Sequence, residues 1–264
     1  MVCEPTILFA YGRYHMWYFG GGKQAAIGYA ESADGVTWHK RQGPVVGLGT
    51  GGFQPMAMRN FVVRQHGVYY LFFASDNSDR ALHVATSHDG IHFKTFPRPI
   101  LRPSAWNSGM ANTDVWVENG RWFMLYEAWT THLGIWRMAL AEGNNPYAWR
   151  KVTGPLASLQ VGVGMYGGPA VLKIDRVYHL WYHAALKTSL PTDIYHATST
   201  DLIHWRRVAD GPVVPRSLLW EVDQTADPDV IVRGHRLWMY YAGMDNVSGV
   251  GQIGLATTAL PSRL

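Results

Sequence analysis

A nine-residue segment that recurs four times along the chain is the strongest constraint on its fold. The first copy, residues 30–38, reads Ala-Glu-Ser-Ala-Asp-Gly-Val-Thr-Trp, and the others cover 85–93, 141–149 and 197–205. The aromatic residues that close the copies fall 55, 56 and 56 residues apart. A period this constant indicates repeats of one supersecondary unit. A fifth, incomplete copy begins at Ala256.

Each copy has a turn signal at its centre, such as Asp34-Gly35 or Asn144-Asn145. Asp, Asn and Gly tolerate positive φ, so the segment predicts a tight hairpin between two paired strands. The aromatic residue at the end of each copy is named here the closing aromatic. We expect the closing aromatics Trp38, Trp149 and Trp205 to lie between neighbouring repeats, where a buried indole stabilises the contact.

The rest of each repeat also predicts strands. An apolar strand is followed by a turn and by an aromatic-rich strand; residues 5–9 and 14–18 are the first such pair, and 230–232 and 237–241 are the last. Four antiparallel strands in each of five repeats predict an all-β fold, a five-bladed β-propeller. The 12 Trp, 14 Tyr and 28 Gly residues agree with a β protein rich in turns.

We expect residues 1–264 to form a single domain. The blades are predicted at roughly 4–48, 53–103, 106–157, 164–215 and 221–260. The chain starts at the innermost strand of blade one and ends at the third strand of blade five. The last blade is therefore expected to have three strands, unless a longer native N-terminus supplies the fourth.

Composition argues against several classes of function. The formal charge is +4, but no basic run exceeds two residues, whereas a nucleic-acid surface needs a concentrated basic stripe. No run of 18 apolar residues predicts a membrane span. The opening Met-Val-Cys-Glu-Pro has no secretory signal, so a cytoplasmic location is expected. The lone Cys3 excludes an internal disulfide framework.

In a propeller, the starts of the innermost strands crowd together at one mouth of the central channel. Alignment of the blades places five residues at equivalent positions there: Glu4, Arg59, Asn112, Gly168 and Asp227. Two residues further on, with side chains on the same face of each strand, come Thr6, Phe61, Asp114, Ala170 and Asp229. Several carboxylates and one Arg are thus expected to converge. The alternative is that these carboxylates cap strand starts by accepting bonds from backbone amides.

A second layer is expected where the second strands return to this mouth. Its ionisable members are Glu127 and His183, and either could act as a general acid. The alternative for His183 is a core histidine with both ring nitrogens hydrogen-bonded. Trp129 and Tyr166 are candidates for a platform that stacks on sugar rings, although most aromatics of this kind are packing residues.

The chain resembles the five-bladed propeller glycosidases of glycoside hydrolase families 32, 43 and 68. The resemblance rests on Glu4-Pro5-Thr6, Gly167-Gly-Pro-Ala170, Ala226-Asp-Pro-Asp229, the aromatic strands 15–18 and 178–182, and the repeated segment. It implies an Asp before Pro on blade one as base or nucleophile, a second Asp on blade three, and a Glu before Gly-Pro on blade four as acid. Here those positions hold Glu4, Asn112 with Asp114 two residues on, and Gly167. The acid motif has therefore departed on blade four, which removes the proton donor that glycoside hydrolysis uses.

Two hypotheses for function follow. In the first, the protein is an enzyme acting on a glycosidic bond or a related sugar derivative: Glu4 or Asp227 is base or nucleophile, and Glu127 or His183 donates the proton. Asp114 would position sugar hydroxyls. Arg59, Asn112, Asp229, Trp129 and Tyr166 are the expected substrate-binding residues. In the second, the protein is a non-catalytic sugar-binding propeller that has lost the general acid.

The expected ligand is a small-molecule or oligosaccharide substrate, with no cofactor. The 12 His residues show no spacing typical of metal ligands, so no metal site is predicted from them. The resemblance nevertheless allows a structural calcium ion in the channel. Oligomeric state, sugar identity and stereochemical outcome are left open by the sequence.

Overall fold

The computed structural model describes residues 1–21, 26–46, 58–74, 80–188 and 190–260. Blade one contains β1 (Val2–Ala10), β2 (Arg13–Gly20), β3 (Ala26–Ser32) and β4 (His39–Lys40). Blade two contains β5 (Met58–Gln65), β6 (Val68–Ala74), β7 (Leu82–Ser87) and β8 (Lys94–Thr95). Blade three contains β9 (Asn107–Glu118), β10 (Arg121–Thr130), β11 (Trp136–Asn145) and β12 (Ala148–Lys151).

The chain continues in the same pattern. Blade four contains β13 (Tyr166–Ile174), β14 (Val177–Ala185), β15 (Thr192–Ser199) and β16 (Arg206–Arg207). Blade five contains β17 (Gln224–Arg233), β18 (Arg236–Asp245) and β19 (Val250–Ala259). The helical elements in the described residues are the 3-10 turns η1 (Ala157–Leu159) and η2 (Leu219–Glu221). The all-β class and the four-stranded antiparallel sheets are confirmed. Within the described residues blade five has three strands, and one parallel pair between Thr192 and Gln224 joins it to blade four in a seven-stranded sheet.

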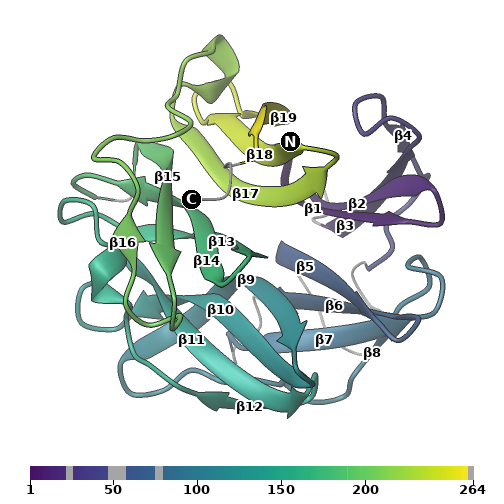
Figure 1. Cartoon of the computed structure of the whole chain (residues 1–264), viewed down its shortest axis with the longest axis horizontal. Helices are drawn as coiled ribbons and strands as arrows, with labels where there is room; N and C mark the ends of the chain where they lie inside the picture. Colours follow the sequence, from purple (N-terminus) through teal and green to yellow (C-terminus); the bar gives the residue numbers. More distant parts are fainter. Residues whose placement is uncertain (22–25, 47–57, 75–79, 189, 261–264) are drawn as a thin grey trace.

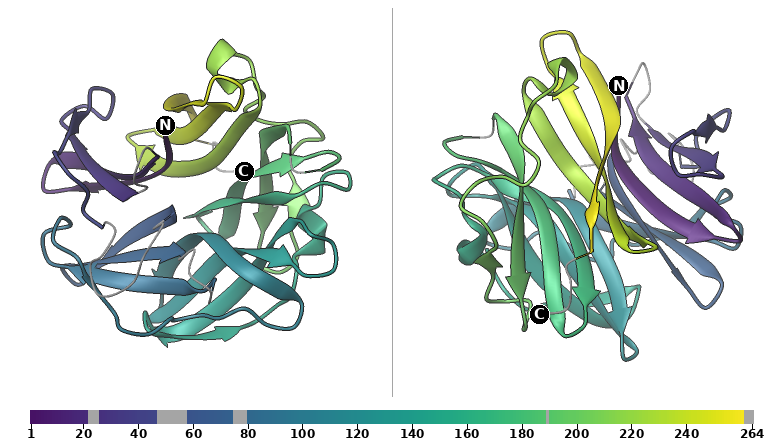
Figure 2. Two further views of the ribbon diagram at one scale, coloured as in Figure 1. Left: turned by 180° about the vertical axis from the view of Figure 1, so that it is seen from behind. Right: turned by 45° about the horizontal axis from the view of Figure 1, so that its top comes forward.

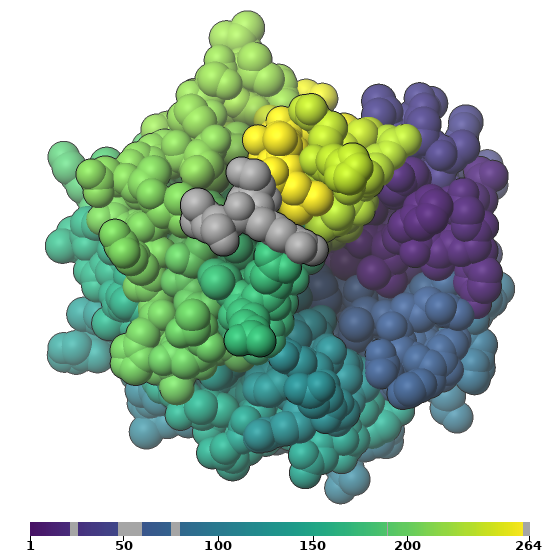
Figure 3. Space-filling view, viewed as in Figure 1, coloured from purple at the N-terminus to yellow at the C-terminus, as the bar shows by residue number. Residues whose placement is uncertain are grey.

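The blades follow one another around a common axis in chain order (Figures 1 and 3). The innermost strands contact each other in sequence, β1 with β5, β5 with β9, β9 with β13 and β13 with β17. β17 also contacts β1, so the innermost strands form a closed ring. Two other views show the same tilted sheets around this ring (Figure 2). The arrangement is that of a propeller with five blades.

Buried carboxylates join neighbouring innermost strands. The backbone N–H of Val171 in β13 donates to the Asp114 carboxylate in β9. In the same way the N–H of Ile7 in β1 donates to Asp229 Oδ2 in β17 at 2.5 Å. Burial raises the pKa of Asp114 well above its usual range, and the charge of Asp229 adds to the effect. Burial raises the pKa of Asp229 to about 7.

Five buried clusters fill the five contacts between blades, and the closing aromatics take part in four of them. Trp38 of blade one meets Tyr240 of blade five edge to face, with ring centroids 5.9 Å apart. Trp149 of blade three meets Phe72 of blade two in the same geometry at 6.0 Å. Trp205 is buried in a cluster that includes residues of blades three and four. The predicted position of these indoles between blades is confirmed.

The turn inside the repeated segment differs from the prediction. In blades one, two and four, six residues separate the third and fourth strands, so the expected tight hairpin is wrong there. A side-chain network closes these turns: in blade four, Ser199 Oγ donates to Asp201 Oδ1, which accepts the N–H groups of Ile203 and His204. In blade three, where Asn145 pairs with Ala148, the turn is a tight two-residue one.

Among the described residues, no helix is long and apolar enough to cross a membrane.

Trp205 is 5% exposed, so its removal leaves a cavity between blades three and four. We expect Trp205→Ala to lower the free energy of unfolding by about 3–5 kcal/mol. Denaturant titration measures this change, with Val247→Ala as a control because Val247 is 94% exposed. Equal midpoints for Trp205→Ala and the parent protein would contradict the placement of this indole.

Asp229 gives a pH-dependent prediction. Its pKa is about 7 in the folded chain, against about 3.9 in an unfolded one, so its neutral form stabilises the fold below pH 4. That contribution is lost as the pH rises through 7. Asn at this position still accepts the Ile7 N–H but does not ionise. We therefore expect Asp229→Asn to gain on the order of 2–4 kcal/mol over wild type between pH 4 and pH 8.

Urea titrations of both proteins at the two pH values check this difference, and Asp210→Asn serves as the control because Asp210 is exposed. A constant difference between Asp229→Asn and wild type would show that Asp229 is ionised throughout.

Candidate functional site

The innermost strands of blades one, four and five bulge at the same point. The register with the second strand shifts between Cys3 and Thr6, between Gly167 and Ala170, and between Ala226 and Asp229. Each bulge holds a residue with positive φ followed by proline. These residues are Glu4 (φ 55°), Gly168 (φ 58°) and Asp227 (φ 47°).

The left-handed conformation costs a non-glycine residue about 1–2 kcal/mol. Blade four avoids this cost by using Gly168, whereas blades one and five keep an acid, Glu4 and Asp227, at the equivalent position. Non-glycine residues held in this way cluster at active sites, where the surrounding structure maintains the strain. The two bulges therefore mark Glu4 and Asp227 as functional candidates.

Both acids line a cavity of about 230 Å³ near the start of the innermost strands. Its polar side includes Glu4, Asn112, Glu127, His183 and Asp227. Five sequence-predicted site residues, from blades one, three, four and five, are thus brought together. Its apolar side includes Phe19, Trp136, Met165 and Met244. A pocket that combines an apolar wall with a few convergent polar groups is typical of small-molecule sites.

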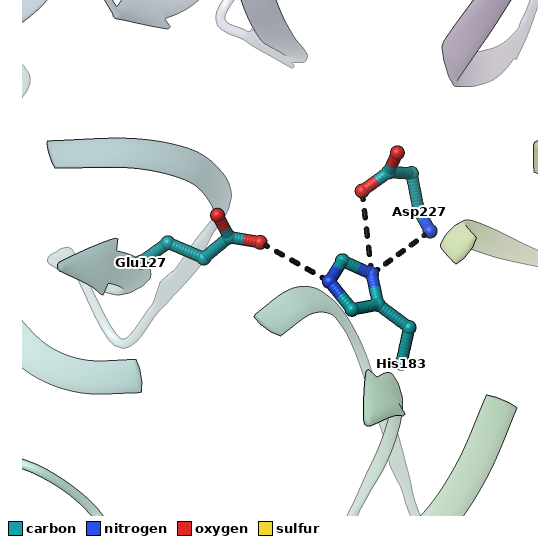
Figure 4. A group of neighbouring side chains, drawn as sticks. All are labelled: Glu127, His183 and Asp227. Carbon is teal, nitrogen blue, oxygen red and sulfur yellow. Dashed lines mark hydrogen bonds and ion pairs between the residues drawn. The ribbon is translucent and has the colours of Figure 1, made fainter. Parts of the chain in front are cut away.

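The imidazole of His183 lies between two carboxylates (Figure 4). Its Nε2 is 3.8 Å from Glu127 Oε1, and its Nδ1 is 3.4 Å from Asp227 Oδ1. The backbone N–H of Asp227 donates to Nδ1 at 3.3 Å. Because that bond requires a lone pair on Nδ1, a neutral His183 carries its proton on Nε2, facing Glu127.

The Asn112 amide holds the two carboxylates together. Its Nδ2 donates to Asp227 Oδ1 at 2.6 Å and to Glu127 Oε1 at 3.1 Å. The backbone N–H of Gly168 also donates to Glu127 Oε1, at 2.5 Å. Glu127 is 1% exposed, so these bonds fix its carboxylate in the wall of the cavity.

The Glu127 carboxylate also explains the glycine at position 167. A Cβ atom at Gly167 would lie 2.2 Å from Glu127 Oε1, closer than real contacts allow. A side chain at position 167, such as the glutamate that the resemblance implies, would therefore require the Glu127 carboxylate to move. The side chain of Glu127, carried by β10, occupies the space beside the backbone of β13 instead.

Glu127, His183 and Asp227 could hold a cation. Each offers one ligand atom, and these atoms lie within 4.8 Å of one another. Carboxylate and imidazole donors suit a divalent cation. The Asn112 amide presents its NH₂ group to both carboxylates, and rotating it by half a turn would present its oxygen to the ion instead. The donor set therefore fits a metal ion.

The other predicted site residues whose side chains are described do not line this cavity. The carboxylates of Asp114 and Asp229 accept backbone N–H groups of the next innermost strand, as their strand-capping alternative anticipated. Asp229 also lines a small cavity that Glu4 and Asp227 share. Tyr166 is fully buried, and its hydroxyl donates to Leu156 O at 3.0 Å. Arg59 is in β5, but its side chain lies outside the described residues.

Trp136 is the site aromatic that sequence reasoning missed. The predicted residue, Trp129, is half-buried and meets Trp136 edge to face with centroids 5.2 Å apart. It is Trp136, paired with Trp129 across β10 and β11, that lines the cavity. The sequence could have indicated Trp136, because it is the first residue of the third strand of blade three and lies opposite Trp129 in the hairpin.

No protein-family model matches the chain. The uncharacterized protein Rv1502 of Mycobacterium tuberculosis is 31% identical over 134 residues. That match covers 46% of this chain and 44% of the relative, so the chain spans less than half the length of the curated relative that it matches.

Solved structures resemble the whole chain. A structure described as a complex of BT0996 and RGII has a TM-score of 0.82 and 15% identity, covering 100% of this chain and 88% of that one. A thermostable family-43 glycoside hydrolase has a TM-score of 0.79 and 13% identity, with 97% and 89% covered. A structure from the GH130 family of mannoside phosphorylases and glycoside hydrolases has a TM-score of 0.74 and 16% identity, with 98% and 84% covered. The chain therefore has the β-propeller fold found in these glycoside hydrolase structures.

Proposed function

We propose that the protein is a glycosidase that hydrolyses a glycosidic bond, or a bond in a related sugar derivative, in the cavity between Glu4 and Asp227. The observation that carries the proposal is the pair of strained bulges, which turn two acids from opposite ends of the chain toward one pocket. Glycoside hydrolysis commonly uses two carboxyl groups that flank the scissile bond. The fold shared with glycoside hydrolases supports the same class of substrate.

The local contacts suggest distinct roles for the acids. Asp227, oriented by Asn112, or Glu4 would be the base or nucleophile. Glu127 would be the proton donor, because its carboxyl lies beside Gly167, where the resemblance places the acid. Both Asn112 and Gly168 donate to Oε1, so the proton would be carried on Oε2. His183, with Nε2–H toward Glu127, would position that carboxyl or take over as donor.

The apolar wall suggests how a sugar would be held. Trp136 and Phe19 offer ring faces or edges to the C–H groups of a pyranose or furanose, while the polar wall faces its hydroxyls. A substrate-binding role for Arg59 stays part of the proposal, since its strand position is equivalent to those of Glu4 and Asp227.

A second candidate function is non-catalytic sugar binding. The observation that favours it is Gly167, which stands where the resemblance expects the acid. In that case Glu127 and His183 would form a hydrogen-bonded wall for the ligand and transfer no proton.

Charge-neutralising substitutions test the catalytic assignment. We expect Glu4→Gln, Asp227→Asn and Glu127→Gln each to lower kcat/KM at least about 100-fold, since a positioned acid or base contributes roughly 10²–10⁴. Hydrolysis of a panel of nitrophenyl glycosides and oligosaccharides measures the rates. Asp210→Asn, a change of the same kind at an exposed position, should leave them unchanged. Thermal melts confirm that each variant is folded.

Wild-type rates in both Glu4→Gln and Asp227→Asn would remove these residues from the chemistry. Calorimetry with the same sugars separates the two functions. Binding without turnover across the panel would favour the sugar-binding protein.

A further inference from the structure

Exposed aliphatic side chains lie in the loops of blades three to five at the end of the propeller that holds the cavity. The second strands return to the end where the innermost strands begin, so the loops that follow them lie at this end, as do the segments that connect neighbouring blades. Leu and Val side chains of these loops are between 51% and 94% exposed. We call them the apolar rim; its members are Leu133, Val163, Leu186, Leu219, Val222 and Val247.

The apolar rim continues the wall of the cavity along the chain. Five rim residues lie only two or three positions from a residue that lines the cavity. These pairs are Leu133 with Trp136, Val163 with Met165, Leu186 with His183, Val222 with Gln224 and Val247 with Met244. Part of a ligand that extends from the cavity toward solvent on this side therefore meets the rim.

Val163 and Leu186 form the part of the rim that is joined most directly to the cavity wall. The Val163 N–H donates to Leu186 O at 2.9 Å, and the Met165 N–H donates to Thr188 O at 2.8 Å. The Ala185 N–H donates to Met165 O at 2.9 Å. The two segments therefore lie side by side, with Met165 in the wall of the cavity and with Val163 and Leu186 exposed beside it.

Few charges interrupt this part of the rim. Segments 131–135, 160–165 and 186–188 contain Lys187 as their only Asp, Glu, Lys or Arg residue. By contrast, each hairpin between the first and second strands, at the opposite end of the propeller, has an arginine at or beside its turn. These residues are Arg13, Arg64, Arg121, Arg176 and Arg233. Exposed apolar surface of the kind found at the rim commonly marks an interaction site.

We propose that the apolar rim binds the hydrocarbon aglycone of an amphiphilic glycoside whose sugar occupies the cavity. This inference rests on the proposed function and names its substrate class, glycosides that carry an alkyl chain. The sugar contacts the polar wall, which includes Glu4 and Asp227. The chain leaves the cavity past Met165 and lies across Val163 and Leu186, where contact with these side chains removes apolar surface from water.

Glycosides that differ only in chain length test the proposal. The probes are the methyl, butyl and octyl glycosides of the sugar that binds or reacts best in the nitrophenyl panel, each used below its critical micelle concentration. A fully buried methylene group increases affinity roughly fourfold, so we expect the octyl glycoside to be favoured over the methyl one at least about tenfold. Calorimetry gives this ratio for glycosides that are not cleaved, and kcat/KM gives it for those that are.

Paired substitutions locate the chain on the rim. Val163→Ser combined with Leu186→Ser removes apolar surface, and both side chains are more than half exposed, so the fold should be retained. Val163→Ile combined with Leu186→Ile is the matched control because it keeps the surface apolar. We expect the serine pair to lower the octyl-to-methyl ratio at least about fivefold without changing the methyl glycoside, and the isoleucine pair to retain the ratio. If the serine pair does not fold, Leu186→Ser alone should lower the ratio about twofold.

The results separate a failure of this proposal from a failure of the proposed function. Absence of both binding and turnover across the whole panel would contradict both. Binding or turnover that does not depend on chain length, or a folded serine pair that keeps the full ratio, would overturn only the role of the rim. Self-association of the wild-type chain that the serine pair abolishes would also overturn it, because a second copy would then cover the rim. Analytical ultracentrifugation over a range of protein concentrations measures this association.

Discussion

The contact between the first and last innermost strands is the constraint on which the site depends. β1 meets β17 in the ring, and the Ile7 N–H donates to Asp229 across this junction. Trp38 on Tyr240 adds a buried aromatic contact between the same two blades. Glu4 lies two residues before Thr6 in β1, and Asp227 lies two residues before the aligned Asp229 in β17. Closure of the ring therefore brings the two acids to one cavity although they lie 223 positions apart along the chain.

The bulges and the glycines of the innermost strands determine which side chains reach the cavity. Glu4 and Asp227 accept a strained backbone that turns them toward the cavity, whereas Gly168 takes the same conformation without strain. Gly167 leaves room for the Glu127 carboxylate, which approaches from the neighbouring blade. The carboxyl group beside β13 of blade four thus comes from β10 of blade three. The cavity therefore contains three acids, Glu4, Glu127 and Asp227, although position 167 is a glycine.

Blade-to-blade packing follows one rule. The aromatic residue at the end of a repeated segment packs on a large side chain of the preceding blade, as Trp38 does on Tyr240. Where that large side chain has a donor, as in Trp17 and Tyr240, it hydrogen-bonds to a glycine carbonyl in the turn of the repeated segment. Closing aromatics take part in four of the five clusters between blades. The fifth cluster, between blades four and five, includes Trp181, Ile194, Val230 and Leu237.

The sequence by itself determined the repeat, the class of fold and the position of the closing aromatics, because a constant period and alternating apolar residues are local properties of the chain. It also indicated that Glu4, Asn112, Glu127, His183 and Asp227 would converge, since strand alignment predicts which positions share a face. Only the tertiary structure decided that Asp114 and Asp229 join strands, that Trp136 rather than Trp129 lines the cavity, and that the Glu127 carboxylate occupies the space beside Gly167. Those outcomes depend on bulges that rotate single residues and on contacts between different blades, and neither is encoded in the pattern of any one strand.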